Sequence, residues 1–226
     1  MASRIGQAWK THGAAALPWL LLRKALAKVI RTETLVVYRH SLNDSSLLSL
    51  PPNPSVQFVK IDKPGSALFE RLCSLYPRSN FFERMERGGR QCFVAMRQDM
   101  IVGYAWVASS TLYIDEIACM YPVAQSEIFI YDCFIDEHCR GQGIYPALLG
   151  AVLQDHCRRY NGLERACIAA VSDNRASIRG ILKAGFVELT RVRYLEWGQH
   201  YRKWWGLTPG YGLRVRGVSE NVDGEF

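Results

Sequence analysis

Two glycines stand between a strand-like segment and a helix-like segment, and they constrain the fold of this chain more than any other feature. The run 127–135 (EIFIYDCFI) predicts a strand, and 143–160 (GIYPALLGAVLQDHCRRY) predicts a helix, with Gly141 and Gly143 at the junction. The first N–H groups of a helix have no partner within it and attract anions. Because glycine has no side chain, a phosphate can approach these amides closely. The segment therefore predicts an anion-binding cradle, although the glycines alone also fit a plain tight turn.

The residues around the glycines favour a pyrophosphate ligand. Arg140 adds positive charge, Ile144 can begin the helix, and Pro146 fits the first turn, where a missing N–H group costs nothing. The GxGxxG pattern of dinucleotide-binding folds requires a small residue where this chain has Pro146, and the GxxxxGK[ST] pattern of P-loops is missing. The pattern thus disfavours dehydrogenases and nucleotide triphosphatases.

Length and charge narrow the class of protein further. The chain has 226 residues, of which 49% are hydrophobic and 22% charged, so it can bury one core and we expect one main domain. The formal net charge is +7, and the first 40 residues contribute seven basic residues against one acidic residue. The remainder is nearly neutral, so we do not expect a nucleic-acid partner.

The cysteines indicate a reducing compartment. The chain has seven cysteines, an odd number, and most of them lie in apolar runs with no closely spaced pairs. This usage is typical of reduced, packed thiols in a cytoplasmic protein. A zinc site requires ligands at short spacing, so we expect no metal.

The N-terminal segment is basic and amphipathic. The apolar run 14–22 (AAALPWLLL) is much shorter than the roughly 20 residues that span a bilayer. Residues 17–31 predict a helix with basic residues on one side and apolar residues on the other. Such a helix packs on the domain, or it contacts an anionic membrane surface or an acidic partner. The predicted location is cytoplasmic, with a peripheral contact at the inner membrane face left open.

The remaining pattern alternates strands and helices and predicts an α/β protein with one mixed sheet. We expect strands at 34–42, 56–61, 127–135, 165–171, 187–197 and 200–205, a hairpin over 90–109, and helices at 65–76, 80–88, 143–160 and 174–186. The hairpin turns at Gln98 and Asp99, and the proline-rich segment 49–55 (SLPPNPS) is the clearest linker. We therefore divide the chain into an N-terminal extension (1–50), a main domain (51–206) and a C-terminal tail (207–226).

A second motif follows 34 residues after Arg140, in the segment NRASIRGILKAGF. Together the two motifs resemble the GCN5-related N-acetyltransferase (GNAT) family, whose signature [QR]xxGx[GA] binds the pyrophosphate of acetyl-CoA and precedes an Asn-led helix that ends in Gly-Phe. Arg140 and Gly143 match the signature, and the later helix is matched by Asn174, Ser177, Gly185 and Phe186. The resemblance covers residues 56–200.

The resemblance implies a GNAT-like fold with an N-terminal helical extension, acetyl-CoA as acyl donor, and transfer to a primary amine. The implied acceptor is a small molecule such as an amino sugar, or a peptide, and the protein is a monomer or a homodimer. The backbone of Phe134 and Ile135 would pair with the pantetheine arm. The implied cofactor-binding residues are Phe134, Ile135, Arg140, Gly141, Gln142, Gly143, Ile144, Tyr145, Asn174 and Ser177. Asn174 also fits the role of a helix N-cap.

Two residues depart from the family pattern. Tyr145 occupies the place of a glycine or alanine, so its ring must cover the phosphates or point away from them. Ile181 occupies the place, seven residues after Asn174, where many members carry a tyrosine that protonates the departing thiolate. An alternative is therefore a catalytically weak module used for CoA sensing or for binding a protein or membrane surface.

Acyl transfer to an amine also requires a proton acceptor, because an amine with a pKa of about 10.4 is mostly protonated at neutral pH. The candidates are Glu127, at the start of the strand and placed like the glutamate base of some family members, and Asp132, closer to the glycines. Strand alternation predicts that these two carboxylates lie on opposite faces. Tyr131, Tyr104 or water could protonate the leaving thiol.

Overall fold

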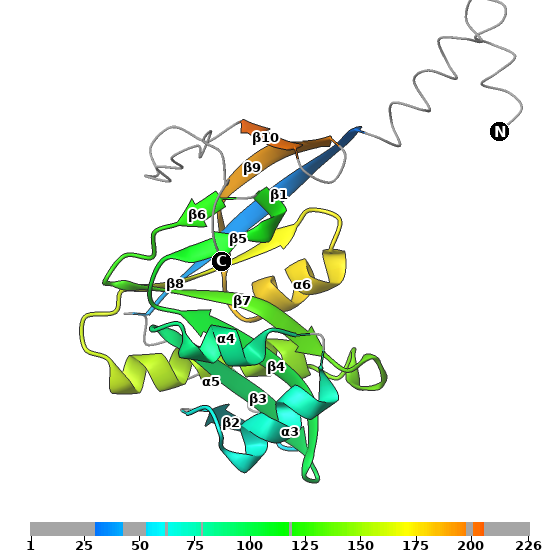
Figure 1. The fold of residues 1–226 in the computed structure, drawn as a ribbon, viewed down its shortest axis with the longest axis vertical. Helices are drawn as coiled ribbons and strands as arrows, with labels where there is room; N and C mark the ends of the chain where they lie inside the picture. The colour runs from blue at the N-terminus through cyan, green and yellow to red at the C-terminus, as the bar shows by residue number, and fades with distance from the viewer. Residues whose placement is uncertain are drawn as a thin grey trace, which may run out of the picture.

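The computed structural model describes residues 30–42, 53–61, 63–77, 79–117, 119–197 and 201–205 (Figure 1). The strands are β1 (Ile30–Ser41), β2 (Gln57–Ile61), β3 (Arg90–Arg97), β4 (Met100–Ala108), β5 (Leu112–Ile114), β6 (Cys119–Tyr121), β7 (Glu127–Ile135), β8 (Arg165–Val171), β9 (Val187–Trp197) and β10 (Tyr201–Trp205). The helices are α3 (Ala67–Leu75), α4 (Phe81–Glu86), α5 (Ile144–Arg159) and α6 (Arg175–Lys183), with single turns η2 (Asp115–Ile117) and η3 (Glu137–Cys139).

Most of the predicted elements are confirmed, and their local sequence explains them. The β3–β4 hairpin turns at Gln98 and Asp99, which have φ values of 47° and 64°, as a two-residue turn of the primed type requires. Helix α3 begins where the Ser66 side chain accepts a hydrogen bond from the Phe69 amide at 3.2 Å. The sequence did not predict β5 and β6, because three-residue strands are too short to show an alternating pattern.

The N-terminal helix prediction is wrong where it can be compared. Ile30 and Arg31, its last two residues, begin strand β1. Residues 17–29 lie outside the described residues, as do most of the predicted linker and the predicted tail. Among the residues that are described, no helix is long and apolar enough to cross a membrane.

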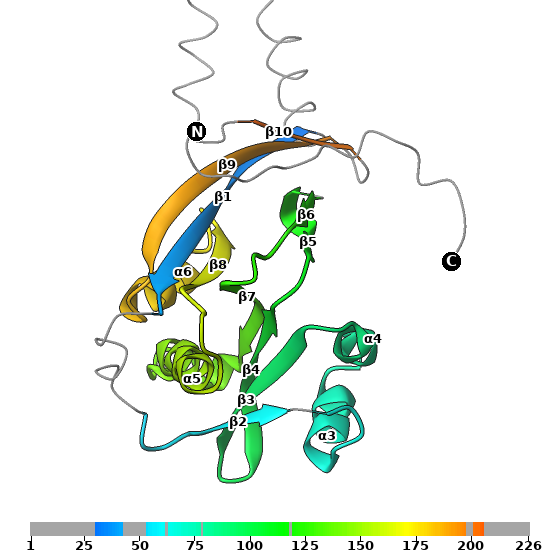
Figure 2. The ribbon, with the colours of Figure 1, turned by 90° about the vertical axis from the view of Figure 1, so that its left-hand side faces the viewer.

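Among the described residues, eight strands form one sheet in the order β10-β9-β1-β8-β7-β4-β3-β2, and only β7 and β8 pair in parallel. Strand β1 lies between β8 and β9, so this part of the predicted extension is an integral strand of the sheet. Helices α5 and α6 cover one face of the sheet, whereas α3 and α4 lie on the other (Figure 2). Each layer buries its own apolar cluster, which includes Leu148 and Ile181 on the first face and Phe69 and Trp106 on the second.

Strand β7 positions the site, because its pairing with β8 ends near the point where its pairing with β4 shifts register. Its parallel pairing with β8 joins 127–130 to 165–168, and beyond these residues the two strands separate. On the other side, Tyr104 of β4 pairs with Phe134, whereas Trp106 pairs with Tyr131. Two residues of β7, 132 and 133, therefore face one residue of β4, which is a β-bulge. The bulge lies where the sheet opens.

Candidate active site

A cleft of about 420 Å³ lies where β7 and β8 separate, on the face that α5 and α6 cover. We call it the glycine cleft. It is lined by 133–135 of β7, by Cys139, Arg140, Gly141 and 143–146 at the start of α5, and by Asn174, Ala176, Ser177, Arg179, Gly180 and Lys183 around α6. Of the ten residues predicted to bind the cofactor, Gln142 is absent from this lining and the others are brought together.

The two glycines adopt the conformation that their residue type permits. Gly141 and Gly143 have φ values of 77° and 73°, in the left-handed region that L side chains rarely adopt. A Cβ atom added at either residue would meet no heavy atom within 4 Å, so the space in front of the helix is open. Gly143 is the N-cap of α5 and provides no side chain to bond the first amides. This is the geometry of an anion cradle at a helix N-terminus.

Three cations surround this cradle. Arg140, Arg179 and Lys183 line the glycine cleft, and all three are exposed. Arg140 is held in place because its Nε donates a hydrogen bond to the carbonyl oxygen of Ile135 at 3.0 Å. The sequence predicted Arg140 but not Arg179 and Lys183, whose spacing of four residues on one helix face was the available signal. The charge of the cleft suits a ligand with several phosphate oxygens.

Gln142 has a structural role at the edge of the cleft. Its side-chain oxygen accepts a hydrogen bond from Arg97 at 2.7 Å, and its Nε2 donates to the carbonyl oxygen of His138 at 3.1 Å. Its own carbonyl oxygen accepts from Asn53 at 3.0 Å. These bonds tie the glycine loop to the β3–β4 hairpin and to the segment before β2.

The ring of Tyr145 lies over helix α6. A Cβ atom at Gly180 would overlap this ring, so the absence of a side chain at Gly180 makes room for it. The Tyr145 hydroxyl lies 3.3 Å from the Ser177 hydroxyl, and it also interacts with the Cys133 thiol. Burial raises the pKa of Tyr145, so the phenol stays protonated.

Asn174 and Ser177 are joined at the start of α6. The Asn174 side chain accepts a hydrogen bond from the Ser177 amide at 3.1 Å, so Asn174 is the N-cap of the helix. Both residues also line the glycine cleft. The predicted N-cap role of Asn174 is therefore confirmed, and the capping residue also lies at the glycine cleft.

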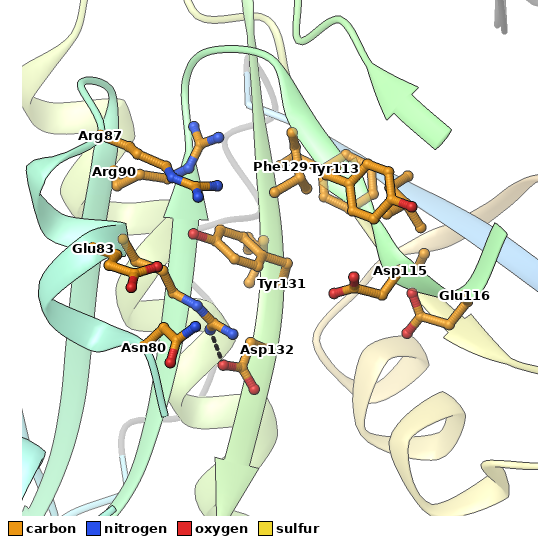
Figure 3. Close-up of a pocket in the computed structure, with 15 residues that line it drawn as sticks. Asn80, Glu83, Arg87, Arg90, Tyr113, Asp115, Glu116, Phe129, Tyr131 and Asp132 are labelled. Carbon is orange, nitrogen blue, oxygen red and sulfur yellow. Dashed lines mark hydrogen bonds and ion pairs between the residues drawn. The ribbon is translucent and has the colours of Figure 1, made fainter. Parts of the chain in front are cut away.

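A second hollow, also of about 420 Å³, lies on the opposite face of β7 (Figure 3). We call it the polar pocket. It is lined by Asn80, Glu83, Arg84, Arg87 and Arg90, by 112–116, by 129–132 of β7, and by Ala169. The sequence did not predict this pocket, because its charged residues come from separate segments that carry no motif.

Asp132 lines the polar pocket, and the bulge explains how it comes to do so. Its φ of 43° rotates the chain, and Tyr131 and Asp132 both line this pocket although they are adjacent in the sequence. The prediction that strict alternation governs this strand is therefore wrong at the bulge. Asp132 is exposed, and its carboxylate forms an ion pair with Arg84 (Figure 3).

Glu127, the other predicted base, lies away from both cavities. It is 2% exposed and lines neither the glycine cleft nor the polar pocket. Its two carboxylate oxygens accept hydrogen bonds from the Tyr121 hydroxyl at 2.5 Å and from Arg165 at 2.7 Å. The carboxylate is thus fully engaged in joining β6, β7 and β8. This geometry indicates a structural role for Glu127.

The two tyrosines considered as proton donors lie in different surroundings. Tyr104 is buried among Tyr76, Phe81 and Phe134 and lines neither cavity. Tyr131 lines the polar pocket, and the guanidinium carbons of Arg84 and Arg90 lie 5.8 and 5.9 Å from its ring centre. Burial raises the pKa of Tyr131 to about 12, although the two arginines partly offset this effect.

The linings of the two cavities are adjacent along one strand, β7. Residues 129–132 of β7 line the polar pocket, and 133–135 line the glycine cleft. Consecutive Cα atoms are about 3.8 Å apart, so groups bound in the two cavities can approach each other at the opening beyond Ile130. The arrangement can bring a phosphate-bearing ligand and a polar ligand together over the edge of β7.

The family model of the acetyltransferase (GNAT) family matches residues 61–186, which is more than half of the chain. The chain belongs to the GNAT family. Members of this family are generally acyl-CoA N-acyltransferases. The matched range begins at the end of β2 and finishes at Phe186, so it contains β7, both glycines and α6.

Solved structures share the fold of this GNAT domain at low sequence identity. A tandem GNAT protein from the clavulanic acid biosynthesis pathway is 17% identical, with a TM-score of 0.51, over 80% of this chain and 58% of that chain. A conserved protein of unknown function from Staphylococcus epidermidis ATCC 12228 is 13% identical, with a TM-score of 0.50, over 79% of this chain and 67% of that chain. No curated protein matches the sequence. At these identities the likeness extends to the fold alone.

Proposed function

We propose that the protein transfers an acetyl group from acetyl-CoA to a primary amine, with the donor in the glycine cleft and the acceptor in the polar pocket. The observation that carries this proposal is that the linings of the two cavities adjoin along β7, where this strand separates from β8. Membership of the GNAT family supports an acyl-CoA donor. The acetyl group as the group transferred, and a small amine or a peptide as the acceptor, are part of the proposal.

The glycine cleft fits the donor at both ends. The open space before Gly141 and Gly143, with three cations around it, suits the pyrophosphate. Beyond Ile130, β7 has no pairing partner on the β8 side, so the backbone of Phe134 and Ile135 is available to an extended arm. Acetyl-CoA supplies the activated acyl group, and the chain orients it beside the polar pocket.

Asp132 is our candidate for the proton acceptor. It is the carboxylate of β7 that lines the polar pocket, and it stands at the bulge beside the cleft. Its ion pair with Arg84 holds the side chain in the pocket, and a carboxylate can accept a proton from an ammonium group. Transfer of that proton to the carboxylate leaves the amine neutral and nucleophilic.

Tyr145 is our candidate for the proton donor to the leaving thiol. It lines the glycine cleft, on the side where the donor lies, whereas Tyr131 faces the acceptor side. Its hydroxyl reaches Cys133, next to the bulge. The hydroxyl is protonated at neutral pH, and we assign to it the role of the tyrosine that is missing at Ile181.

The second candidate function is a binding module without turnover, and Ile181 is the observation that favours it. This side chain is fully buried in the apolar cluster, so it cannot present a polar group to the cleft. A module of this kind would bind CoA through the same cradle but release no thiol.

One pair of measurements separates these functions. Thermal unfolding with and without CoA and acetyl-CoA tests the cradle, because a ligand at 100 times its dissociation constant adds about 2.7 kcal/mol. Thiol release from acetyl-CoA with a panel of amines tests the chemistry. We expect both a thermal shift and amine-dependent release. A shift without release from any amine would favour the binding module, and the absence of a shift at millimolar CoA would refute both.

A further inference from the structure

The two sides of the polar pocket differ in charge, although the arginine side also includes Glu83 of α4. Arg87, just after α4, and Arg90, at the start of β3, stand on one side of Tyr131, and Asp115 and Glu116 of η2 stand on the other (Figure 3). Among the residues that the structure describes, no hydrogen bond or ion pair joins the two walls. The opposite charges therefore face each other across the pocket without neutralising each other.

The arginine side of the pocket is held by hydrogen bonds to uncharged groups, so the charge of its guanidinium groups is not neutralised by these bonds. The guanidinium of Arg90 donates to the Ser110 hydroxyl at 2.8 Å and to the carbonyl oxygen of Thr111 at 2.5 Å. Arg87 is exposed, its backbone amide donates to the carbonyl oxygen of Glu83, and its guanidinium forms no hydrogen bond or ion pair within the described part of the chain. Glu83 lines the same side of the pocket, but among the described residues its carboxylate forms no ion pair with either arginine, so an anionic ligand group could bind both guanidinium groups. The third arginine, Arg84, is already paired with Asp132.

These charges divide the pocket into two subsites. The Asp132 carboxylate lies at the junction with the glycine cleft, where an amine must lie in order to react. Arg87 and Arg90 lie farther from this junction, beyond Tyr131, where the remainder of the acceptor would extend (Figure 3). A neutral amine would leave the arginine subsite unused, and a polycation would place a positive charge against it.

We propose that the acceptor is an amine that also carries a carboxylate or phosphate group, with the anionic group bound at Arg87 and Arg90 and the amino group at Asp132. This inference rests on the proposed function, since it takes the polar pocket as the acceptor site. The acidic wall at Asp115 and Glu116 then accepts hydrogen bonds from further hydroxyl or N–H groups of the same molecule.

The test compares amines that differ in one group. Thiol release from acetyl-CoA is measured with ethanolamine, β-alanine, 2-aminoethyl phosphate and 1,3-diaminopropane, and with glucosamine against glucosamine 6-phosphate. We expect kcat/KM to be about 10- to 100-fold higher for the anionic amines than for their neutral counterparts, as for charge-assisted hydrogen bonds. The diamine would be no better than ethanolamine. The carboxylate and phosphate arms identify the anionic group.

Variants of Arg87 test whether the preference for anionic amines depends on the arginine subsite. Arg87→Glu is expected to abolish the preference for anionic amines, and Arg87→Lys to retain part of it. Arg71→Glu is the matched control, because Arg71 is exposed on α3 and lines neither cavity. High salt is also expected to reduce the preference, since the Arg87 side chain is exposed.

Each outcome has one meaning. Equal rates for neutral and anionic amines, or a preference that survives Arg87→Glu, would overturn the inference while leaving acetyl transfer in place. If no amine releases thiol, thermal shifts decide the matter in the presence of CoA. Stabilisation by the anionic amines, lost in Arg87→Glu, would support the pocket assignment without acetyl transfer. No stabilisation by any amine would overturn the inference as well.

Discussion

The glycine cleft and the polar pocket have the same volume, but they are built in different ways. The cleft consists largely of backbone: left-handed glycines, the first amides of α5 and the unpaired edge of β7. The pocket consists of charged side chains from α4, β3, η2 and β7. A backbone site requires residues that lie close together in the sequence and have little side-chain bulk. A side-chain site requires only that the fold brings its charges together.

This difference predicts how the two cavities respond to substitution. Changes in the cleft act through shape and affect binding of the donor, whereas changes in the pocket act through charge and affect the acceptor and the rate. Substitutions in each cavity test whether donor binding and turnover respond separately.

Asp132→Asn is expected to have the largest effect. Turnover at neutral pH is expected to fall by about 10²- to 10⁴-fold with CoA binding unchanged, because the amine loses its proton acceptor. The loss shrinks as the pH rises from 6 to 9.5, since a larger share of the amine is then already neutral. Steady-state rates across that range provide the measurement. A rate near that of the wild type would mean that water or the substrate removes the proton.

Gly143→Asp is expected to abolish donor binding. The new side chain would occupy the open space before α5 and place a negative charge where the phosphates bind. The stabilisation by CoA, about 2.7 kcal/mol at 100 times the dissociation constant, would be lost in a thermal unfolding experiment. Gly65→Asp is the control, because Gly65 has a φ of 80°, has equal open space, and lies outside both cavities. A folded Gly143→Asp that still binds CoA would refute the cradle.

Glu127→Gln is expected to lower stability without changing the chemistry. The substitution weakens the hydrogen bonds from Tyr121 and Arg165, at a cost of about 2 kcal/mol, a moderate value because half of the Arg165 side chain is exposed. Urea denaturation reports the change, and turnover per folded molecule is expected to match the wild type. Full stability combined with lost turnover would move the proton acceptor back to Glu127.

Tyr145→Phe is expected to reduce turnover by about tenfold while CoA affinity is retained. The effect is modest because a thiol with a pKa of about 8.5 is already a good leaving group. Tyr131→Phe provides the comparison from the polar pocket. If Tyr131→Phe lowers the rate and Tyr145→Phe does not, the proton donor lies on the acceptor side of β7.

Gly180→Ala tests the packing that makes room for Tyr145. The added methyl group would overlap the ring, so we expect a loss of about 1 kcal/mol after the gain in helix propensity is subtracted. In a Tyr145→Ala background the overlap is gone, and the same change is expected to stabilise α6 slightly. Denaturation midpoints of the four proteins form a double-mutant cycle. The same loss in both backgrounds would contradict the packing.

Much of the fold could be predicted because the signals for its strands, turns and helix caps lie in neighbouring residues. The alternation of 127–135, the turn at Gln98 and Asp99, and the cap at Asn174 each depend on neighbouring residues. The prediction failed where tertiary contacts decide, as at Ile30 and Arg31, which pair with β9. Strands β5 and β6 were missed because each pairs with the other over three residues.

The sequence by itself determined the glycine cleft of this protein. Glycines before a helix and an Asn-led helix after the next strand specify a phosphate cradle and the GNAT family, because left-handed backbone and helix ends depend on residue types in sequence order. Only the tertiary structure decided the polar pocket. A single bulge turned Asp132 into the polar pocket, the sheet buried Glu127 against Tyr121 and Arg165, and the arginines and acids gathered from separate segments. Strand register and long-range packing set those positions, and no short stretch of sequence contains them.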